Sequence, residues 1–354
     1  MTIRGVLSEA RRNLCTGVAR AGLWAAVTLV VVGLLSLADV ATVRGMEREA
    51  RAYQAAAANA RKLAAVGQID GAVCDALTLS STVQAAGAIR LIDPITVDQA
   101  PDVPLTAYEV SPGLGRVITD NDTNRLGVWV EASLADALAI GEGGVLTVSH
   151  ISMPIAGVFA WPDDGRDARL SFAVLIPVAP DATFDECWLK AWPVFDANDQ
   201  LLRSTAVVTS MPTPVQVTQL NKSLGVAFDA NRMFLERVTS NVRWASPAAM
   251  LVIGFVSSRL RRLEYAAALH AGQARGALLL GVGVEALVWA ATGACIAVVV
   301  DLIAIRIMAF VSACPVWLLS AGVAMNSFIG AIAGALLGAV VIREKDLFRY
   351  FRTR

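Results

Sequence analysis

Residues 22–40 read GLWAAVTLVVVGLLSLADV, and this apolar run decides how the rest of the chain is interpreted. A helix rises 1.5 Å per residue, so about 20 residues cross the ~30 Å hydrocarbon core of a bilayer. The run therefore predicts a first transmembrane helix over residues 22–42. A cleaved signal peptide is the alternative, because arginines precede the run and small residues follow it. Its length, however, exceeds the usual signal core of about 7–15 residues.

Three further apolar stretches near the end of the chain predict a second, third and fourth membrane helix. They cover residues 244–258, 276–313 and 316–341, and the range 276–313 includes an extension of the third helix on the outer side of the membrane. Hydrophobic residues make up 56% of the 354-residue chain, which is too many for an ordinary globular protein. The excess is local, because the intervening residues 43–243 are rich in Asp, Pro and Gly. These residues predict a large water-exposed domain between the first and second membrane helices.

Basic residues indicate on which side of the membrane each segment lies, because Lys and Arg close to membrane helices are retained in the cytoplasm. They concentrate in residues 1–21, 259–275 and 342–354, which we therefore assign to the cytoplasm. Acidic residues outnumber basic ones in the large domain, which is predicted to be extracytoplasmic. Arginine greatly outnumbers lysine, as is typical of a GC-rich bacterial genome. The chain is thus predicted to be a multi-pass protein of the bacterial inner or plasma membrane, with both termini cytoplasmic.

The predicted outer domain begins and ends with helical segments and has a mixed α/β pattern between them. Residues 43–66 contain strong helix formers and no proline, so the first membrane helix is expected to continue outward as a stalk. Apolar residues recur at near-helical intervals between Leu220 and Val238, which predicts a matching return stalk. Between the stalks the pattern predicts a helix and four strands, at residues 70–79, 86–92, 105–110, 171–178 and 188–194.

Residues 127–162 read GVWVEASLADALAIGEGGVLTVSHISMPIAGVFAWP and predict a strand, a short helix, a glycine turn and two alternating strands. This order resembles a unit of the periplasmic core domain in MacB/FtsX-type (type VII) ABC transporter permeases. There the unit ends in Val-x-Gly-Val, and here it ends in residues 155–158, Ile-Ala-Gly-Val. The resemblance implies a membrane α-helical fold with four transmembrane helices and an inserted extracytoplasmic α/β domain of the MacB-like kind.

Residues 261–287 read RRLEYAAALHAGQARGALLLGVGVEAL and resemble the cytoplasmic segment of the same family, Arg-Arg-x-Glu-Ile…Gly-Ala-Ser…Glu-Ala. The resemblance implies a coupling helix that docks on a separate ABC ATPase. Leu269 replaces a common Arg of the family, so the surface is expected to select a particular ATPase. Three further usual residues are replaced by His270, Ala271 and Gln273. The implied coupling residues are Arg261, Arg262, Glu264, His270, Gly272 and Gln273.

Two features of the predicted membrane helices are candidates for function. Gly330, Gly334 and Gly338 repeat every four residues, which predicts a close-packing face on the fourth helix. The face packs either within the subunit, which we favour, or across a dimer. Glu285 lies inside the third helix, where a carboxylate is costly. We favour a structural group that accepts hydrogen bonds from a neighbouring helix over a proton carrier.

Cys74 and Cys187 are the two cysteines of the predicted outer domain. An oxidising compartment allows them to pair in a disulfide. Two separately buried thiols are the alternative, because sequence does not show whether their Cα atoms come within the required ~7 Å.

The chain carries no motif of catalysis. It lacks a Gly-x-x-x-x-Gly-Lys-Ser/Thr phosphate loop, a Gly-x-Ser-x-Gly motif and a His-Glu-x-x-His motif, and its two histidines and dispersed cysteines give no metal-ligand spacing. We expect no catalytic residue, metal or cofactor in this chain, with ATP and Mg²⁺ bound by the partner ATPase. The basic and aromatic tail beside the last membrane helix predicts contact with membrane lipid rather than nucleic acid.

The resemblance implies a permease subunit that couples ATP hydrolysis in the ATPase to conformational change outside the membrane, that is, mechanotransmission. The expected cargo is a peptide, lipopeptide, lipoprotein or hydrophobic antibiotic. A second permease subunit, identical or different, completes the pair. The alternative is a non-transporting FtsX-like regulator that activates a secreted partner, such as a cell-wall hydrolase or a lipoprotein. A membrane sensor without an ATPase is a third hypothesis, which the coupling-helix resemblance disfavours.

Overall fold

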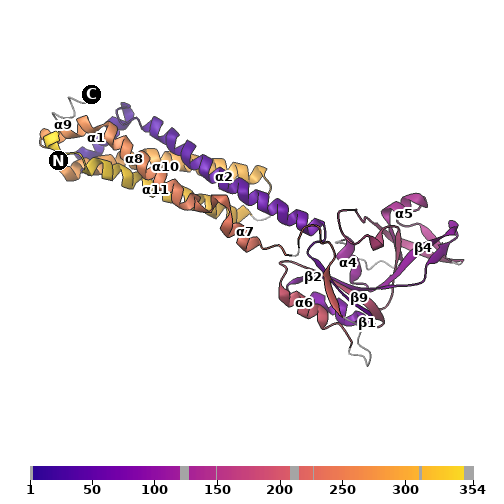
Figure 1. Cartoon of the computed structure of the whole chain (residues 1–354). Coiled ribbons are helices and arrows are strands. Elements are labelled where there is room, and N and C mark those ends of the chain that lie inside the picture. Colours follow the sequence, from indigo (N-terminus) through magenta and orange to yellow (C-terminus); the bar gives the residue numbers. More distant parts are fainter. Residues whose placement is uncertain are drawn as a thin grey trace. The chain divides into compact units, whose positions relative to one another are not determined.

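The computed structural model describes six stretches of the chain: residues 3–119, 127–148, 150–207, 215–225, 227–310 and 313–346. The chain divides into two compact units (Figure 1). The helical unit comprises residues 1–48 and 230–354, and the β-rich unit comprises residues 49–229. Both boundaries fall inside the predicted outer domain of residues 43–243. Residues 347–354 of the predicted tail lie outside the described residues.

The described part of the helical unit contains three helices, α2, α10 and α11, that are long and apolar enough to cross a membrane. The predicted second membrane helix, α8, is shorter and carries Arg243 and Arg259 near its ends. The segment before the first membrane helix forms a helix of its own, α1. The helices are α1 (Ile3–Cys15), α2 (Ala21–Ala55), α7 (Ala230–Glu236), α8 (Val242–Leu260), α9 (Arg262–His270), α10 (Arg275–Ile307) and α11 (Ala313–Val340), with single 3₁₀ turns at Val238–Asn241 and Glu344–Asp346.

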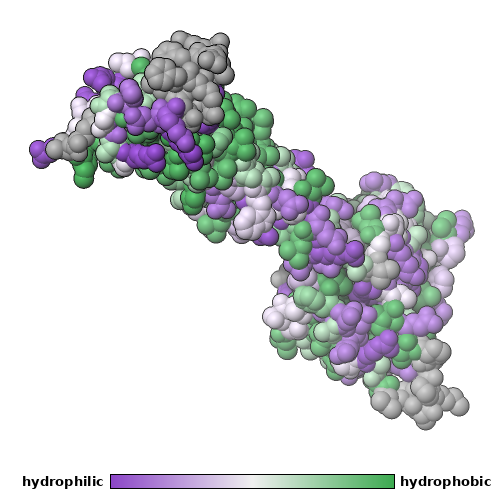
Figure 2. Space-filling model, turned by 60° about the vertical axis from the view of Figure 1, so that its left-hand side comes forward, coloured by the Kyte–Doolittle hydropathy of each residue, from purple (hydrophilic) through white to green (hydrophobic). Residues whose placement is uncertain are grey.

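Large apolar side chains point outward from the three long helices. Leu34 of α2, Ile303 of α10 and Ile329 of α11 are each more than half exposed. Figure 2 shows hydrophobic residues gathered along the visible face of the helical unit, with hydrophilic residues at its end. A surface of this kind is unfavourable in water and is expected to face lipid.

The interior of the helical unit is built largely from small residues. Ala266, Ala290, Ala297, Ala331 and Ala335 are at most 1% exposed and belong to one apolar cluster. Small side chains let helices approach closely, which is how helices associate where lipid provides no hydrophobic driving force.

The described part of the β-rich unit contains ten strands in the order β10-β1-β9-β2-β4-β3-β6-β7-β5-β8. Because β8 also pairs with β4, six strands from β4 to β8 close into a ring by hydrogen bonding. The strands are β1 (Ala60–Asp70), β2 (Val83–Leu91), β3 (Ile95–Val97), β4 (Ala100–Val110), β5 (Val128–Glu131), β6 (Val145–Val148), β7 (Ile151–Phe159), β8 (Ala173–Pro177), β9 (Thr183–Ala191) and β10 (Gln216–Gln219). The helices of this unit are α3 (Gly71–Ala76), α4 (Leu114–Thr119), α5 (Ala132–Ala137) and α6 (Asp196–Arg203), with 3₁₀ turns at Leu77–Leu79 and Ala168–Leu170.

The pattern predicted for residues 127–162 is confirmed element by element, as β5, α5, a turn, β6 and β7. Glu131 joins the first two elements, because its carboxylate accepts hydrogen bonds from the backbone N–H of Ser133 (2.9 Å) and of Leu134 (3.2 Å) at the start of α5. Gly143 adopts φ +80° in the turn, a conformation that suits glycine. The sequence signals of this stretch are local: Glu131 caps the start of α5, and Gly143 permits the turn before β6.

The predicted first stalk over residues 43–66 is wrong in its second half. Helix α2 ends at Ala55, and Ala60 begins strand β1. β1 pairs antiparallel with both β9 and β10 and buries Leu63 and Ile69 completely. Backbone pairing on two sides and apolar burial outweigh the helix propensity of this alanine-rich segment, which amounts to tenths of a kcal/mol per residue.

The predicted return stalk between Leu220 and Val238 is also wrong as a continuous helix, since among its described residues α7 is the only α-helix. Leu220 is buried in the core of the β-rich unit, and its N–H donates to the carbonyl of Ala60 at 3.0 Å. Phe228 packs on the rings of Tyr53 and Trp192. The apolar residues of this segment therefore serve the β-rich unit instead of one helix face.

The predicted third membrane helix, residues 276–313, is too long at its end. Helix α10 ends at Ile307, and Ala309 adopts φ +50°, which is incompatible with continuing the helix. Residues 311–312 lie outside the described residues.

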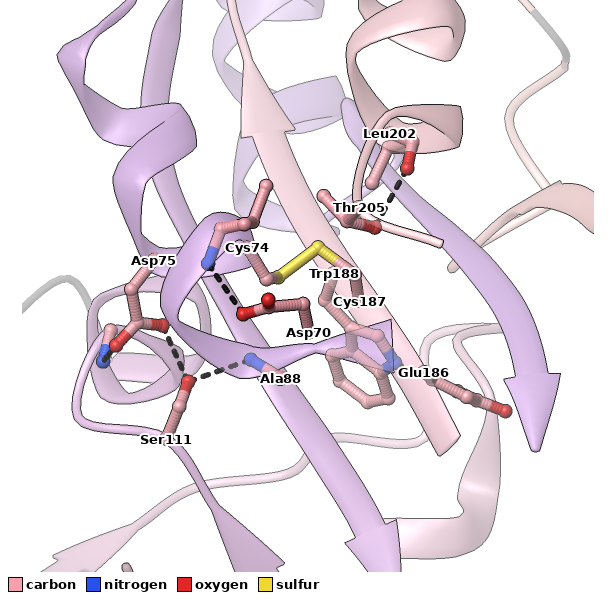
Figure 3. The surroundings of a disulfide bond; sticks show 12 residues. Asp70, Cys74, Asp75, Ala88, Ser111, Glu186, Cys187, Trp188, Leu202 and Thr205 are labelled. Atoms are coloured by element: carbon pink, nitrogen blue, oxygen red, sulfur yellow. Dashed lines mark hydrogen bonds between the residues drawn. A yellow bond between two sulfur atoms is a disulfide. The ribbon is translucent and has the colours of Figure 1, made fainter. Parts of the chain in front are cut away.

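Cys74 of α3 and Cys187 of β9 form a disulfide, with Cα atoms 5.9 Å apart (Figure 3). Both residues are fully buried. The same helix is held at its start by Asp70, whose carboxylate accepts from the N–H of Val73 at 3.0 Å. The disulfide therefore fixes α3 against the middle of the sheet.

A second polar link joins α3 to the sheet through Asp75. Its carboxylate accepts hydrogen bonds from the Ser111 hydroxyl (2.5 Å) and the Gly113 N–H (3.2 Å), and the Ser111 Oγ accepts from the Ala88 N–H (2.7 Å). Burial raises the pKa of Asp75, against the opposing effect of these bonds. The disulfide and this network together hold α3 on both sides (Figure 3).

Replacing both Cys74 and Cys187 with alanine is expected to destabilise the β-rich unit by about 2–5 kcal/mol, because the bond closes a long loop, its cysteines 113 residues apart. Urea unfolding of the full chain in detergent, followed by tryptophan fluorescence, measures the loss. Cys15→Ala is the control, since that thiol is free and exposed. Equal unfolding midpoints for the double variant and the control would contradict the prediction.

Candidate functional site

Helix α9 lies on a short path between two long helices. A single residue, Arg261, separates it from the end of α8, and Gly272 ends it with φ +90°. The Gly272 N–H donates to the Leu269 carbonyl (3.0 Å) and the Gln273 N–H to the Ala268 carbonyl (3.1 Å), which is a Schellman C-terminus. Helix α10 begins three residues later, at Arg275. Few residues therefore connect α9 to α8 and α10, so α9 has little freedom to move independently of them.

One face of α9 is buried and the other is open to solvent. Tyr265 and Leu269 are buried, whereas Glu264, Ala267 and His270 are exposed at spacings of three residues. This spacing places the exposed side chains on one side of the helix. We call these three residues the exposed α9 face.

The predicted coupling residues fall into different environments. Glu264, His270 and Gly272 are exposed, and the Nδ1 atom of His270 lies 3.2 Å from Glu344 Oε1. Arg262 and Gln273 are half-buried.

Arg261 turns inward instead and joins a buried cluster around Glu285. The Arg261 Nη1 donates to Glu285 Oε2, and the Asn13 Nδ2 donates to Glu285 Oε1 at 2.8 Å. The Arg261 Nε also donates to Glu264 at 2.8 Å, and its guanidinium lies over the Tyr265 ring. We call Asn13, Arg261 and Glu285 the Glu285 clamp. It joins α1, the junction of α8 with α9, and α10.

Arg261 and Glu285 form a buried ion pair, and both carboxylate oxygens of Glu285 accept a hydrogen bond. The side chains of Arg261 and Glu285 are 12% and 8% exposed. Burial raises the pKa of Tyr265, so the hydroxyl beside the clamp stays neutral. The cluster thus holds three helices together but presents no reactive group in a cleft.

A cavity of about 140 Å³ adjoins the clamp between α1, α9 and α10. Glu9 and Gln273 contribute to its lining, as do the apolar Val6 and Leu278. Small-molecule sites usually measure about 300–1,000 Å³, whereas one water occupies about 30 Å³ in the liquid. The cavity is therefore of a size for a few waters, and we assign it no ligand.

The three predicted packing glycines lie against helix α8 of the same chain. A Cβ atom at Gly330, Gly334 or Gly338 would come closer than 3.0 Å to a backbone carbonyl oxygen of α8. Gly254 occupies the reverse position, because its Cβ would meet the Ala331 carbonyl of α11. We call these four glycines the glycine seam.

Some residues of these clusters were missed by sequence reasoning. Asn13 and Tyr265 gave no signal, because their positions depend on contacts between distant segments. Gly254 did have a sequence signal, because small residues recur on α8 at multiples of four residues, at Ser246, Gly254 and Ser258. All three face helix α11. Ser246 bonds Ser327 of α11, and the Ser258 Oγ donates to the Ala335 carbonyl at 2.7 Å.

Comparisons with known proteins give only distant similarity. No family model and no curated protein sequence matches the chain. Among solved structures, it is similar to the periplasmic region of MacB from Actinobacillus actinomycetemcomitans, with 12% identity and a TM-score of 0.34 over 46% of this chain and 89% of that one. It is also similar to a permease-protein domain from Porphyromonas gingivalis, with 11% identity and a TM-score of 0.32 over 52% of this chain and 98% of that one. At this level neither match assigns the chain to a family.

Proposed function

We propose that the chain is a permease subunit that transmits force from a separate cytoplasmic ABC ATPase to the β-rich unit outside the membrane. The observation that carries the proposal is the exposed α9 face on a helix with almost no slack to α8 and α10. A displacement of α9 by a docked protein must be taken up by these two long helices.

The Glu285 clamp supports the same proposal, because it ties α9 to two further elements. Arg261 lies between α8 and α9, Glu285 lies on α10, and Asn13 lies on α1. A load on α9 is thereby shared with α1 and α10 through charged hydrogen bonds, which are stronger than neutral ones.

In this proposal α8 also crosses the membrane, as the second of four membrane helices along the chain. It packs along α11 over the glycine seam, and α11 is apolar enough to span. Arg243 and Arg259 are 16 residues apart, or about 24 Å along a helix. Their long side chains can extend toward opposite headgroup regions while the apolar middle of α8 lies in lipid. Four spans place both termini in the cytoplasm.

The partners in this proposal are the ATPase, a second permease subunit and membrane lipid. ATP and Mg²⁺ bind the ATPase, and the cargo is an amphiphilic peptide, lipopeptide, lipoprotein or hydrophobic antibiotic reached from outside the membrane or from its outer leaflet.

Ala267→Arg is expected to weaken binding of the ATPase more than tenfold, because it places a large cation at the centre of the exposed α9 face. A single central residue of an interface can carry about 2 kcal/mol or more. Ala267 is a cleaner probe than Gly272, since any side chain at Gly272 would also strain the backbone that ends α9. The measurement is the amount of ATPase that copurifies from native membranes in mild detergent.

Ala52→Arg is the matched control, because Ala52 is an exposed alanine of α2 that belongs to the β-rich unit. We expect it to retain the ATPase. An ATPase recovered equally with both variants would refute α9 as the docking helix. A wild-type chain that recovers none would refute the proposed function as a whole.

A further inference from the structure

Another buried carboxylate lies in the helical unit, away from the Glu285 clamp. Asp301 of α10 is 1% exposed, and Ser320 of α11 and Ser36 of α2 are 2% and 1% exposed. Ser320 bonds the carboxylate, and Ser36 lies beside it. We call these three residues the Asp301 site. Three of the long helices therefore contribute one polar side chain each to one buried point.

One oxygen of the Asp301 carboxyl group has no hydrogen-bond donor at this site. The Ser320 hydroxyl donates to Asp301 Oδ2, whereas Oδ1 is buried and has no hydrogen-bond partner among the described residues. The Ser36 hydroxyl donates to the Val32 carbonyl of its own helix at 2.8 Å. With that proton committed, Ser36 has only oxygen lone pairs left for the carboxyl group. A proton on Asp301 would supply the missing donor.

The charges around the site do not compensate an ionised Asp301. On α2 the basic residue nearest to Ser36 in sequence is Arg44, which pairs with Glu47 at 2.7 Å. Asp39 of α2 pairs with Arg237 at 2.9 Å, so that cation is neutralised as well. On α10 Arg306 is exposed and forms no ion pair with Asp301 in the described structure. The sequence of α11 contains no acidic or basic residue. A carboxylate buried without a cation is strongly unfavourable and tends to take up a proton instead.

We propose that Asp301 is a proton-binding site, a neutral carboxylic acid in the assembled bundle that donates to Ser36 and accepts from Ser320. Loss of the proton leaves an unpaired charge between α2, α10 and α11 and separates α2 from the other two helices. The ligand is a proton that exchanges with water when the helices part. This site is independent of the exposed α9 face and of the ATPase proposal.

Infrared spectroscopy of the purified full chain in detergent tests the proposal. At about pH 7 we expect the wild type to show a carbonyl band of a protonated carboxyl group that Asp301→Asn lacks. Asp93→Asn is the control, because Asp93 is an exposed carboxylate of the β-rich unit, and its band is expected to be unchanged. A spectrum in which Asp301→Asn removes no such band would overturn the proposal.

Hydrogen–deuterium exchange gives a second readout that does not require the variant to be as stable as the wild type. Each rate is corrected for the intrinsic effect of pH on exchange. As the pH rises from about 6 to about 9, the corrected exchange of wild-type peptides from α2 is expected to increase severalfold. In Asp301→Asn, which cannot ionise, it is expected to stay constant with pH. Constant exchange in the wild type over this range would contradict the proposal.

Discussion

Replacing Glu285 with leucine is expected to lower the free energy of unfolding of the helical unit by about 3–5 kcal/mol, the usual cost of removing one partner of a buried ion pair. The variant removes the buried partner of the Arg261 guanidinium, whose side chain is only 12% exposed, and removes the acceptor of Asn13. Arg261 then keeps only Glu264, whose side chain is 53% exposed. Hydrogen bonds between membrane helices average only about 0.6 kcal/mol. A loss of several kcal/mol therefore reports a guanidinium that has lost its buried counter-charge rather than missing hydrogen bonds.

Two further variants separate these effects. Glu285→Gln keeps an acceptor for Asn13 and is expected to fall between the wild type and Glu285→Leu. The double variant Arg261→Met with Glu285→Leu removes both charges and is expected to recover most of the loss, since apolar residues often replace a buried pair at little cost. Thermal unfolding in one detergent, followed by the fluorescence of Trp24 and Trp289, measures all three. A double variant as unstable as the single one would show that Arg261 is not buried against Glu285.

Gly334→Leu is expected to cost about 3 kcal/mol or more, because it overfills the glycine seam. Even a Cβ atom at Gly334 would come within 3.0 Å of the Leu251 carbonyl oxygen, and backbone atoms of a packed helix cannot move aside cheaply. The side chain would force α8 away from α11 along the most extensive contact between helices in this unit. We expect loss of folded protein from the membrane fraction and a lower thermal midpoint.

Gly322→Leu is the matched control on the same helix, because a Cβ atom there would meet nothing within 4 Å. The better helix propensity of leucine is expected to leave stability unchanged or raised by up to about 1 kcal/mol. Similar losses of stability from both substitutions would contradict the prediction. They would indicate that α11 needs glycine for the conformation of its own backbone and not for contact with α8 at the glycine seam.

The sequence predicted those parts of the fold that depend on local pattern. The strand, helix, turn and strands of residues 127–162 were predicted correctly, because alternation and turn glycines are local signals. The presence of the long apolar helices α2, α10 and α11 was also predicted, although α10 ends at Ile307, six residues earlier than expected. Residues 60–66 were predicted as helix, since the alanine-rich sequence gives no sign that β9 and β10 will pair with it from more than 100 residues away.

In the candidate site, too, features with a local sequence signal were predicted, whereas partners distant in the sequence were not. The four-residue spacing of Gly330, Gly334 and Gly338 predicted a close-packed face, and the spacing alone could not identify α8 as the partner. Glu285 was predicted as a hydrogen-bonded group, whereas its partner Asn13 lies 272 residues away in sequence. Nothing in the sequence around Asp301 indicated that it would be buried beside Ser320 of another helix. Pairwise partners of this kind are set by helix rotation, which composition does not fix.

The strand order also determines when each strand can find its partners while the chain is being synthesised. β1 is the first strand to leave the ribosome, yet both of its neighbours, β9 and β10, are made last, and the partner of Cys74 follows 113 residues later. The sheet therefore stays open until residue 219 has been translated, while α2 waits for α10 and α11 for longer still. A nascent chain with an unpaired strand edge and an unpartnered apolar helix depends on chaperones and the insertion machinery.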